Sequence, residues 1–526
     1  MNSLRTSAVR GAALVAAVFV LLSTNTWAQN PANASPPGET ASAVHELQDQ
    51  VHELRELVEQ MRSENAQSRA EMQKLRQDLQ ATRALLQPPP AGATEPSAAG
   101  NTPPSGAATI SAQNDIPLEQ RVEKLEESTS LLGNKIDEQY QTKVETASRY
   151  RARLHGMVLM NAFRNVGGSD SLDFPTYAQP LAAGVSRATI GATLRQSEVG
   201  LELFGPHLAG ATTSADVQFD FSGGFPYAPN ASNFGIVRLQ TASVRMDWEH
   251  TSIVAGQDPL FISPLSPTSF ASLSIPAFSL AGNLWGWTPQ LRVEHRFSIS
   301  DNQTVTVQAG ILDNLDWEFN YDPFERTAQA GEMSGQPAYA LRTAWSSTVH
   351  QRPLSLAVAG YFGRQDWSSD RYVDAWSGMA DWQIPILPRL ALSGEFYRGR
   401  GVGGLGGGIG RSIVYGANPV YGSSPIRGLD SAGGWTQLKF QLTPKVEFNG
   451  VVAEDDAFAG KIRGFATDLN NFGPIYGRNR GALANVIFRP RSDLVLAAEF
   501  RRLRTFPVYS SSSATNQVNL SVGMLF

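Results

Sequence analysis

Hydrophobic and polar residues alternate one by one through most of the chain after residue 149. In residues 290–297 the apolar positions are Leu291, Val293, His295 and Phe297. The polar positions between them are Gln290, Arg292, Glu294 and Arg296. A period of two residues predicts a β-strand with two different faces. Comparable segments, about sixteen in all, begin near residues 150, 190, 213, 235, 250, 286, 303, 337, 353, 372, 389, 434, 445, 480, 493 and 515.

The predicted connections alternate between long and short. The long ones are residues 164–189, 223–234, 258–285, 314–336, 363–371, 399–433, 455–479 and 504–514. The short ones include residues 298–301, 385–388, 443–444 and 489–492. An even number of dyad-period strands with this alternation is typical of an outer-membrane barrel, which has short periplasmic turns and longer external loops. Residues 149–526 are therefore predicted to form an all-β transmembrane barrel of about 16 antiparallel strands.

The last predicted strand ends the chain with an apolar face and an aromatic residue. That face holds Val518, Leu520, Val522, Met524 and Phe526. The ending resembles that of bacterial outer-membrane proteins, in which the terminal Phe belongs to the signal read by the barrel-assembly machinery. The resemblance implies that Phe526 is an assembly signal and that this machinery is a partner.

The N-terminus has the pattern of a secretory signal peptide. Arg5 and Arg10 precede the apolar residues 12–22, and residues 26–28 offer a small-residue cleavage site. A membrane anchor is the alternative, but the apolar core is short and no stop-transfer pattern follows. We predict a signal peptide over residues 1–28 and a location outside the cytoplasm.

Two heptad segments separated by linkers precede the predicted barrel. Residues 42–87 carry apolar side chains at alternating spacings of three and four, which is the a/d seam of a coiled coil. Polar Asn65 at an a position is predicted to fix the register. A shorter seam occupies residues 116–148, while residues 29–41 and 88–115 are Pro/Ala/Ser-rich linkers. We favour an intermolecular α-helical coiled coil in a trimer; a dimer, or an amphipathic helix packed on its own barrel, is the alternative.

Composition excludes several kinds of chemistry. The 526-residue chain has no cysteine, 17% charged residues and a net charge of −5. It therefore has no thiolate site and no electrostatic basis for binding nucleic acid, and we predict no cofactor and no metal. The glycine-rich residues 401–410 lack the Lys-Ser/Thr of a phosphate loop and are predicted to form a flexible external loop.

The chain resembles the DcaP-like trimeric porins, and it is similar in outline to the phosphate-selective porins O and P. The likeness lies in residues 141–145 and 148–151, residues 195–197 through 204–206, and residues 255–258, within the overall order of signal peptide, coiled coil and barrel. The resemblance implies a homotrimeric diffusion channel for small solutes, including anionic ones such as dicarboxylates or phosphate-like anions.

Charged residues at the polar positions of the alternating strands are candidates to line the pore, since charged side chains at a constriction set selectivity. We predict this role for Arg153, Arg292, Glu294, Arg296, Arg342, Lys439, Lys445, Glu447 and Arg501. Further acids of this parity are Glu198, Glu202, Asp220, Asp381, Glu395 and Glu499. Positive and negative residues nearly balance, which predicts modest selectivity, with Arg292 and Arg296 as the pair that would bind an anion. The third long loop, residues 259–284, is the candidate to fold inward, yet it has no Lys or Arg.

The sequence therefore predicts an outer-membrane porin for passive diffusion, with its coiled coil in the periplasm. One alternative is a structural or adhesive barrel, although such proteins have long stalks and few strands per chain. Another is a barrel enzyme, which needs a Ser/His pair on the lipid-facing side. His295 is the only histidine of that parity, and no serine partner is evident. We therefore predict no enzymatic activity.

Overall fold

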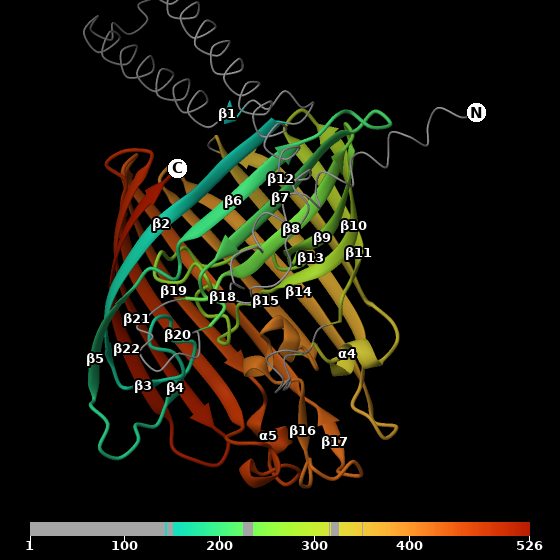
Figure 1. Cartoon of the computed structure of the whole chain (residues 1–526), viewed down its shortest axis with the longest axis vertical. Helices are drawn as coiled ribbons and strands as arrows, with labels where there is room; N and C mark the ends of the chain where they lie inside the picture. Colours follow the sequence, from blue (N-terminus) through green and yellow to red (C-terminus); the bar gives the residue numbers. More distant parts are fainter. Residues whose placement is uncertain (1–142, 145–150, 225–234, 315, 317–325, 350) are drawn as a thin grey trace, which may run out of the picture. The chain divides into compact units, whose positions relative to one another are not determined.

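The computed structural model describes residues 143–144, 151–224, 235–314, 316, 326–349 and 351–526 (Figure 1). The predicted signal peptide, both linkers, the coiled coil with Asn65 and nearly all of the second coiled coil lie outside these residues. Within the second coiled coil, Lys143–Val144 form strand β1 and pair with β2 (Arg151–Val166), so these two residues are not helical. They lie beyond Ile136, where the heptad pattern ends.

The described residues form an antiparallel sheet that closes into a barrel (Figure 1). Its wall consists of β2, β5 (Ala188–Thr193) with β6 (Glu198–Phe204), β7 (Thr212–Asp220), β8 (Arg238–Asp247), β9 (Thr251–Pro259), β10 (Trp287–Ser300), β11 (Gln303–Leu312), β12 (Ala338–Val349), β13 (Arg352–Asp366), β14 (Tyr372–Leu387), β15 (Leu390–Arg400), β18 (Asp430–Thr443), β19 (Val446–Asp456), β20 (Tyr476–Phe488), β21 (Leu494–Pro507) and β22 (Ser513–Leu525). Because β5 and β6 both pair with β2 as one interrupted strand, the wall has sixteen strands. Pairing of β22 with β2 closes it.

Short elements occupy the long connections. They are β3 (Gly168–Ser169), β4 (Ala178–Gln179), α4 (Ala330–Met333), η1 (Gly403–Leu405), η2 (Gly408–Gly410), β16 (Ile413–Tyr415), β17 (Ile426–Gly428), α5 (Ala459–Ile462) and η3 (Asp468–Asn470). No helix in the described ranges is long and apolar enough to cross a membrane. We call the end of the barrel that carries these connections the long-loop end and the opposite end the short-turn end.

The predicted barrel is confirmed, and most of its connections alternate in length as predicted. The connections after β13 (residues 367–371) and after β21 (residues 508–512) are predicted to be long but are shorter than the turn after β6 (residues 205–211), because strands β13, β21 and β22 extend further than predicted. The largest error in a strand start is four residues, at β18 (434 predicted, 430 observed) and at β20 (480 predicted, 476 observed). The interruption between β5 and β6 is not predicted. There the Ser197 N–H donates to Leu194 O at 3.0 Å, and the Ser197 hydroxyl accepts a hydrogen bond from the Leu159 N–H of β2. The chain therefore turns inside the strand, which a two-residue period cannot reveal.

The two faces of the wall differ as the alternation predicts. Leu291, Val293 and Phe297 point outward and are exposed, whereas Arg292 and Glu294 point inward and are buried. On β22 the outward, exposed residues are Val518, Leu520, Val522 and Met524, and Phe526 follows them. Exposed apolar surface on every strand is costly in water and is typical of a barrel surrounded by lipid.

Residues 260–286, which connect β9 to β10 and which we call the inner loop, fold into the barrel. The Leu265 N–H donates to Glu395 at 2.7 Å, the Thr268 N–H to Gln437 at 2.7 Å and the Leu273 N–H to Gln196 at 2.8 Å. These acceptors lie on β15, on β18 and in the break between β5 and β6, so the inner loop spans much of the wall. The third long loop, which the sequence analysis names as the candidate to fold inward, therefore does fold into the barrel.

The inner loop and the glycine-rich loop, residues 401–414, share apolar cores with the wall. Phe261 and Leu284 pack with Val402, Leu405 and inner-face residues of β12 to β15. Phe278 packs with inner-face residues of β18 to β21. Because fully buried side chains fill these positions, the long-loop half of the barrel has a packed interior.

The prediction of a flexible external loop at residues 401–410 is wrong. Val402, Leu405 and Ile409 are buried, the Gly408 N–H donates to Tyr397 Oη at 2.9 Å, and the Ile409 N–H donates to Asp455 Oδ2 at 3.3 Å. Glycines make this fit possible. Gly406, for example, has φ of 86°, where a side chain is strained, and a Cβ there would lie 2.7 Å from a carbonyl oxygen of the inner loop.

Candidate functional site

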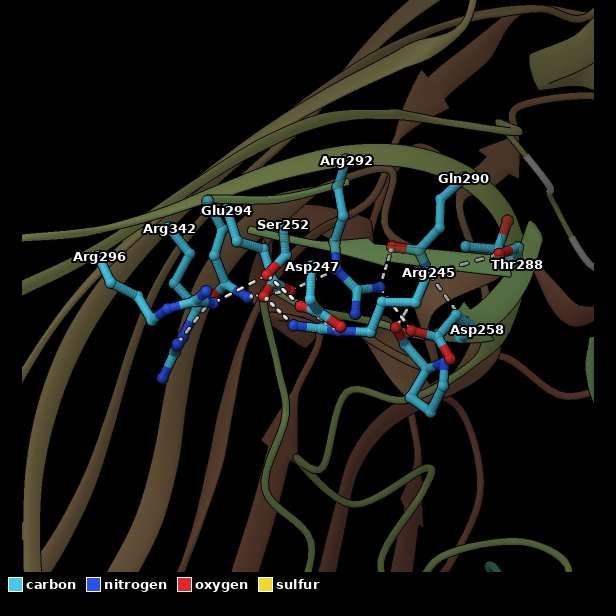
Figure 2. A network of polar contacts seen from close by, with 12 residues as sticks. Arg245, Asp247, Ser252, Asp258, Thr288, Gln290, Arg292, Glu294, Arg296 and Arg342 are labelled. Atoms are coloured by element: carbon cyan, nitrogen blue, oxygen red, sulfur yellow. Dashed lines mark hydrogen bonds and ion pairs between the residues drawn. The ribbon is translucent and has the colours of Figure 1, made fainter. Parts of the chain in front are cut away.

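A network of charged side chains covers the inner face from β8 to β12 (Figure 2), and Arg342 connects it to Asp381 of β14. Its cations are Arg245 of β8, Arg292 and Arg296 of β10, and Arg342 of β12. Its acids are Asp247, Asp258, Glu294 and Asp381. These side chains meet because residues of one parity on neighbouring strands share a face.

Arg292 is held by two carboxylates. Its Nη1 is 2.5 Å from Asp258 Oδ2, its Nε is 2.8 Å from Glu294 Oε1, and its side chain is only 9% exposed. Glu294 also accepts hydrogen bonds from Gln308 at 3.0 Å and from Arg245 at 3.1 Å. The charge of Arg292 is therefore compensated and shielded from water.

The neighbouring cations are compensated as well, apart from Arg296. Arg342 forms a two-pronged pair with Asp381, at 3.0 Å from Nε and 2.8 Å from Nη2. The Nε of Arg245 lies 2.8 Å from Asp247. Arg296 donates to the Ser252 hydroxyl at 2.8 Å and to Trp248 O at 3.2 Å, and forms no ion pair among the described residues. Four cations and four acids make the network neutral overall.

The predicted binding of one anion between Arg292 and Arg296 does not fit this geometry. The residues are four positions apart, or about 13 Å along a strand, and Glu294 projects between them. Arg292 is also occupied by carboxylates. Of the four cations in this network, Arg296 is the one that has no ion pair among the described residues.

Arg501 of β21 stabilises the packed interior. Its Nη2 is 2.7 Å from Glu499 Oε1, its side chain is 2% exposed, and it also donates to the Ser269 hydroxyl at 3.2 Å. Ser269 belongs to the inner loop and donates to Glu499 at 2.6 Å. The predicted candidate Arg501 therefore faces inward, but it anchors the inner loop.

Water reaches charged side chains in the short-turn half. Arg153 of β2 pairs with Glu202 of β6 and remains 58% exposed. Glu447 of β19 lies 3.9 Å from Lys439 Nζ and 3.3 Å from Arg489 Nη1. Two cations thus share one carboxylate. Lys445 lies in the adjacent turn, where its carbonyl accepts a hydrogen bond from the Arg489 N–H at 2.8 Å.

Sequence reasoning misses Gln196, Arg245 and Arg489. A bulge in β8, visible as a register shift at Gln218/Phe219 of β7, moves Arg245 to the inner face against the alternation that begins at Arg238. Arg489 follows β20 in a predicted turn, so the strand alternation assigns it to neither face of the wall. Gln196 lies in the unpredicted break between β5 and β6. In each case the residue lies where the strand is irregular or has ended, so the two-residue alternation does not predict that its side chain faces inward.

A cavity of about 260 Å³ opens at the long-loop end. Its lining includes Arg238, Trp285, Trp287, Asp313 and Leu405. The two indole rings meet edge to face at 5.4 Å, and Arg238 lies 5.0 Å from the Trp287 ring centroid. Burial raises the pKa of the Asp313 carboxyl and Glu332 adds to the shift, while Arg326 opposes it.

Among the described residues, His295 is not bonded to a serine hydroxyl as the histidine of a hydrolase would be. Its Nδ1 is 2.8 Å from the hydroxyl of Thr251, its neighbour across the sheet, and its ring packs against Phe297 at 4.4 Å. No Asp or Glu within the described ranges bonds to this ring. The same ranges hold no group of three His, Asp or Glu residues placed to bind a metal ion.

Comparison with known proteins identifies solved structures that have a similar fold. No family model and no curated protein matches the sequence. Among solved structures, the chain is similar to the outer membrane channel DcaP of Acinetobacter baumannii, with a TM-score of 0.54 and 14% identity, over 73% of this chain and 99% of that chain.

Two further porin structures match less closely. An anion-selective porin from Comamonas acidovorans has a TM-score of 0.44 and 12% identity, over 72% of this chain and 100% of that one. OprB of Pseudomonas putida has a TM-score of 0.43 and 13% identity, over 71% and 94%. At such identities the likeness to DcaP concerns the fold, and for the fold the predicted resemblance is confirmed.

Proposed function

We propose that this protein is a porin that forms a water-filled channel for passive diffusion of small hydrophilic solutes across the bacterial outer membrane. The observation that carries the proposal is the closed sixteen-stranded wall, apolar outside and charged inside. Such a wall needs lipid around it and is wide enough to leave an aqueous channel. The DcaP structure, which shares the fold, is that of an outer membrane channel.

We expect the narrowest part of the channel to lie in the long-loop half. There the inner loop and the glycine-rich loop fill the interior, while Arg153 and Lys439 meet water in the short-turn half. In the proposed orientation the long loops lie outside the cell and the short turns in the periplasm. Solutes would enter past the inner loop and leave through the charged short-turn half.

We expect a modest preference for anions, set by the exposed charges. Lys439 and Arg489 share one carboxylate, and Arg296 has no acidic partner in the described part of the chain. The acids Glu395 and Glu499 are covered by the inner loop and do not face the water-filled region, and Glu499 is paired with Arg501. This surplus of exposed positive charge favours anionic solutes such as dicarboxylates and phosphate-like anions.

Reversal potentials of the purified protein in planar bilayers under a KCl gradient test this proposal. Lys439→Gln combined with Arg489→Gln should shift the reversal potential toward cation selectivity, because Glu447 is left uncompensated. Arg491→Gln is the matched control, since it removes a cation that has its own partner, Asp493, in the turn. An unchanged reversal potential in the double variant would contradict the proposed source of selectivity.

We also propose a homotrimer whose coiled coil, residues 42–87, extends into the periplasm, each protomer having its own pore. A narrow apolar seam needs partners to be buried, whereas a closed barrel forms a pore alone. Removing residues 29–147 should therefore lower the trimer fraction and leave conductance per protomer nearly unchanged. Size-exclusion chromatography with light scattering measures the first quantity and bilayer recording the second. A truncated barrel that folds but does not conduct would contradict this division of roles.

A further inference from the structure

Four arginines lie close together on the outward face near the long-loop end of β20 and β21. They are Arg478 and Arg480 of β20 and Arg502 and Arg504 of β21 (strands shown side by side in Figure 1). We call them the arginine cluster. Arg480 is 50% exposed, and Arg502 and Arg504 are exposed.

The cluster carries more positive charge than its surroundings compensate. Arg480 pairs with Glu454 of β19, and Arg478 reaches the same carboxylate at 3.9 Å. Arg504 donates to the neutral Ser512 hydroxyl at 3.1 Å, and Arg502 has no ion pair among the described residues. The second nearby acid, Asp456, stands opposite Arg478 in the register and accepts a hydrogen bond from the Phe458 N–H.

The backbone register forces like charges together. Arg480 and Arg504 stand directly opposite each other on neighbouring strands, an arrangement that is destabilising unless something compensates it. One aromatic ring gathers three of the guanidinium groups. The distance to the Phe506 ring centroid is 4.9 Å for Arg478, 5.9 Å for Arg480 and 4.9 Å for Arg504. The ring holds them in place but supplies no negative charge.

The position of the cluster along the barrel, relative to the apolar band, identifies what can compensate its positive charge. On β21 the outward residues Leu496, Ala498 and Phe500 precede Arg502 and Arg504, so the apolar band ends where the arginines begin. An apolar band on the outside of a barrel marks the hydrocarbon region. The arginines therefore lie at the level of lipid headgroups on the long-loop side.

We infer that the arginine cluster binds the phosphate groups of a phosphorylated glycolipid in the outer leaflet. Arginine suits this partner because its planar guanidinium group binds phosphate oxygens through paired hydrogen bonds. A phosphate between Arg480 and Arg504 would compensate the like-charge contact that the protein leaves open. The inference rests on the proposed function, because it requires the barrel to be in the outer membrane with its long loops outside.

Native mass spectrometry of the full-length protein with added lipid A tests the inference. Diphosphorylated lipid A should bind, and the same lipid without phosphates should not. Arg480→Gln with Arg504→Gln should weaken binding by about tenfold, since charge-assisted hydrogen bonds to phosphate are lost. The matched control is Arg364→Gln with Arg400→Gln. It removes two outward cations that have carboxylate partners, Asp374 at 3.3 Å and Asp430 at 3.0 Å.

Equal binding by both double variants, or equal binding of the dephosphorylated lipid, would overturn the inference. So would a change in oligomer mass without loss of lipid in Arg480→Gln with Arg504→Gln, because the cluster would then be a contact between copies of the chain. Conductance measured on the same preparations separates the two proposals. A wild-type protein that conducts but does not bind lipid A refutes only the glycolipid site, whereas a folded protein that does not conduct refutes the porin.

Discussion

Replacing residues 264–283 of the inner loop with a short Gly/Ser linker is expected to raise the single-channel conductance several-fold. The loop buries Phe278 and Ala277 against β18 to β21 and thereby fills the interior that a sixteen-stranded wall leaves open. The wall should survive the change. Its own strand pairing is continuous, and Glu395, Gln437 and Gln196, which lose loop partners, would then face water.

The matched control shortens the connection between β2 and β5 instead. Residues 181–186 are all exposed, so replacing them with two glycines removes loop length without opening the interior. We expect its conductance to equal that of the wild type. If the inner-loop variant folds, inserts and conducts like the wild type, the inner loop is not the constriction.

Phe526→Asp is expected to remove most of the folded barrel from the outer membrane. The Phe526 backbone closes the seam between β22 and β2 through hydrogen bonds with Gly156, at 3.1 Å from its N–H and 3.0 Å to its carbonyl oxygen. Its ring lies on the outward face, close enough that a Cβ on Gly156 would be 2.7 Å from Cζ. A carboxylate at this position removes the terminal aromatic that resembles the assembly signal and places charge at the lipid boundary.

Leu525→Asp is the control for this prediction, because Leu525 belongs to the opposite parity and is also exposed. The measurement is the amount of heat-modifiable, folded barrel in outer-membrane fractions, relative to total protein. The two variants should differ strongly. Equal yields would show that the terminal ring has no special role in assembly.

The wall was predictable because each strand must present one face to the inside and one to the outside. This requirement is local, so the alternation at residues 290–297 correctly places Arg292 and Glu294 inside and Leu291 outside. The terminal strand through Phe526 follows the same rule. Errors occur where a strand is irregular. The break at residues 194–197 and the bulge of β8 that turns Arg245 inward depend on pairing with neighbouring strands.

The interior was less predictable because its contacts join residues far apart in the sequence. The Thr268 N–H donates a hydrogen bond to Gln437, and the Gly408 N–H donates one to Tyr397 Oη. Neither partner is visible from the loop sequence alone. The same holds for the candidate site. The parity identifies Arg292 and Arg296 as facing inward, but only the positions of Asp258 and Ser252 distinguish a compensated cation from an uncompensated one.

The most direct test of the porin proposal is single-channel recording of the purified, folded protein in planar bilayers. The proposal predicts discrete insertion steps, an ohmic current that rises with KCl concentration, and larger steps when residues 264–283 are replaced. A protein that is folded and inserted, yet electrically silent in both its wild-type and its loop-replaced form, would contradict the claim that this barrel is a diffusion channel.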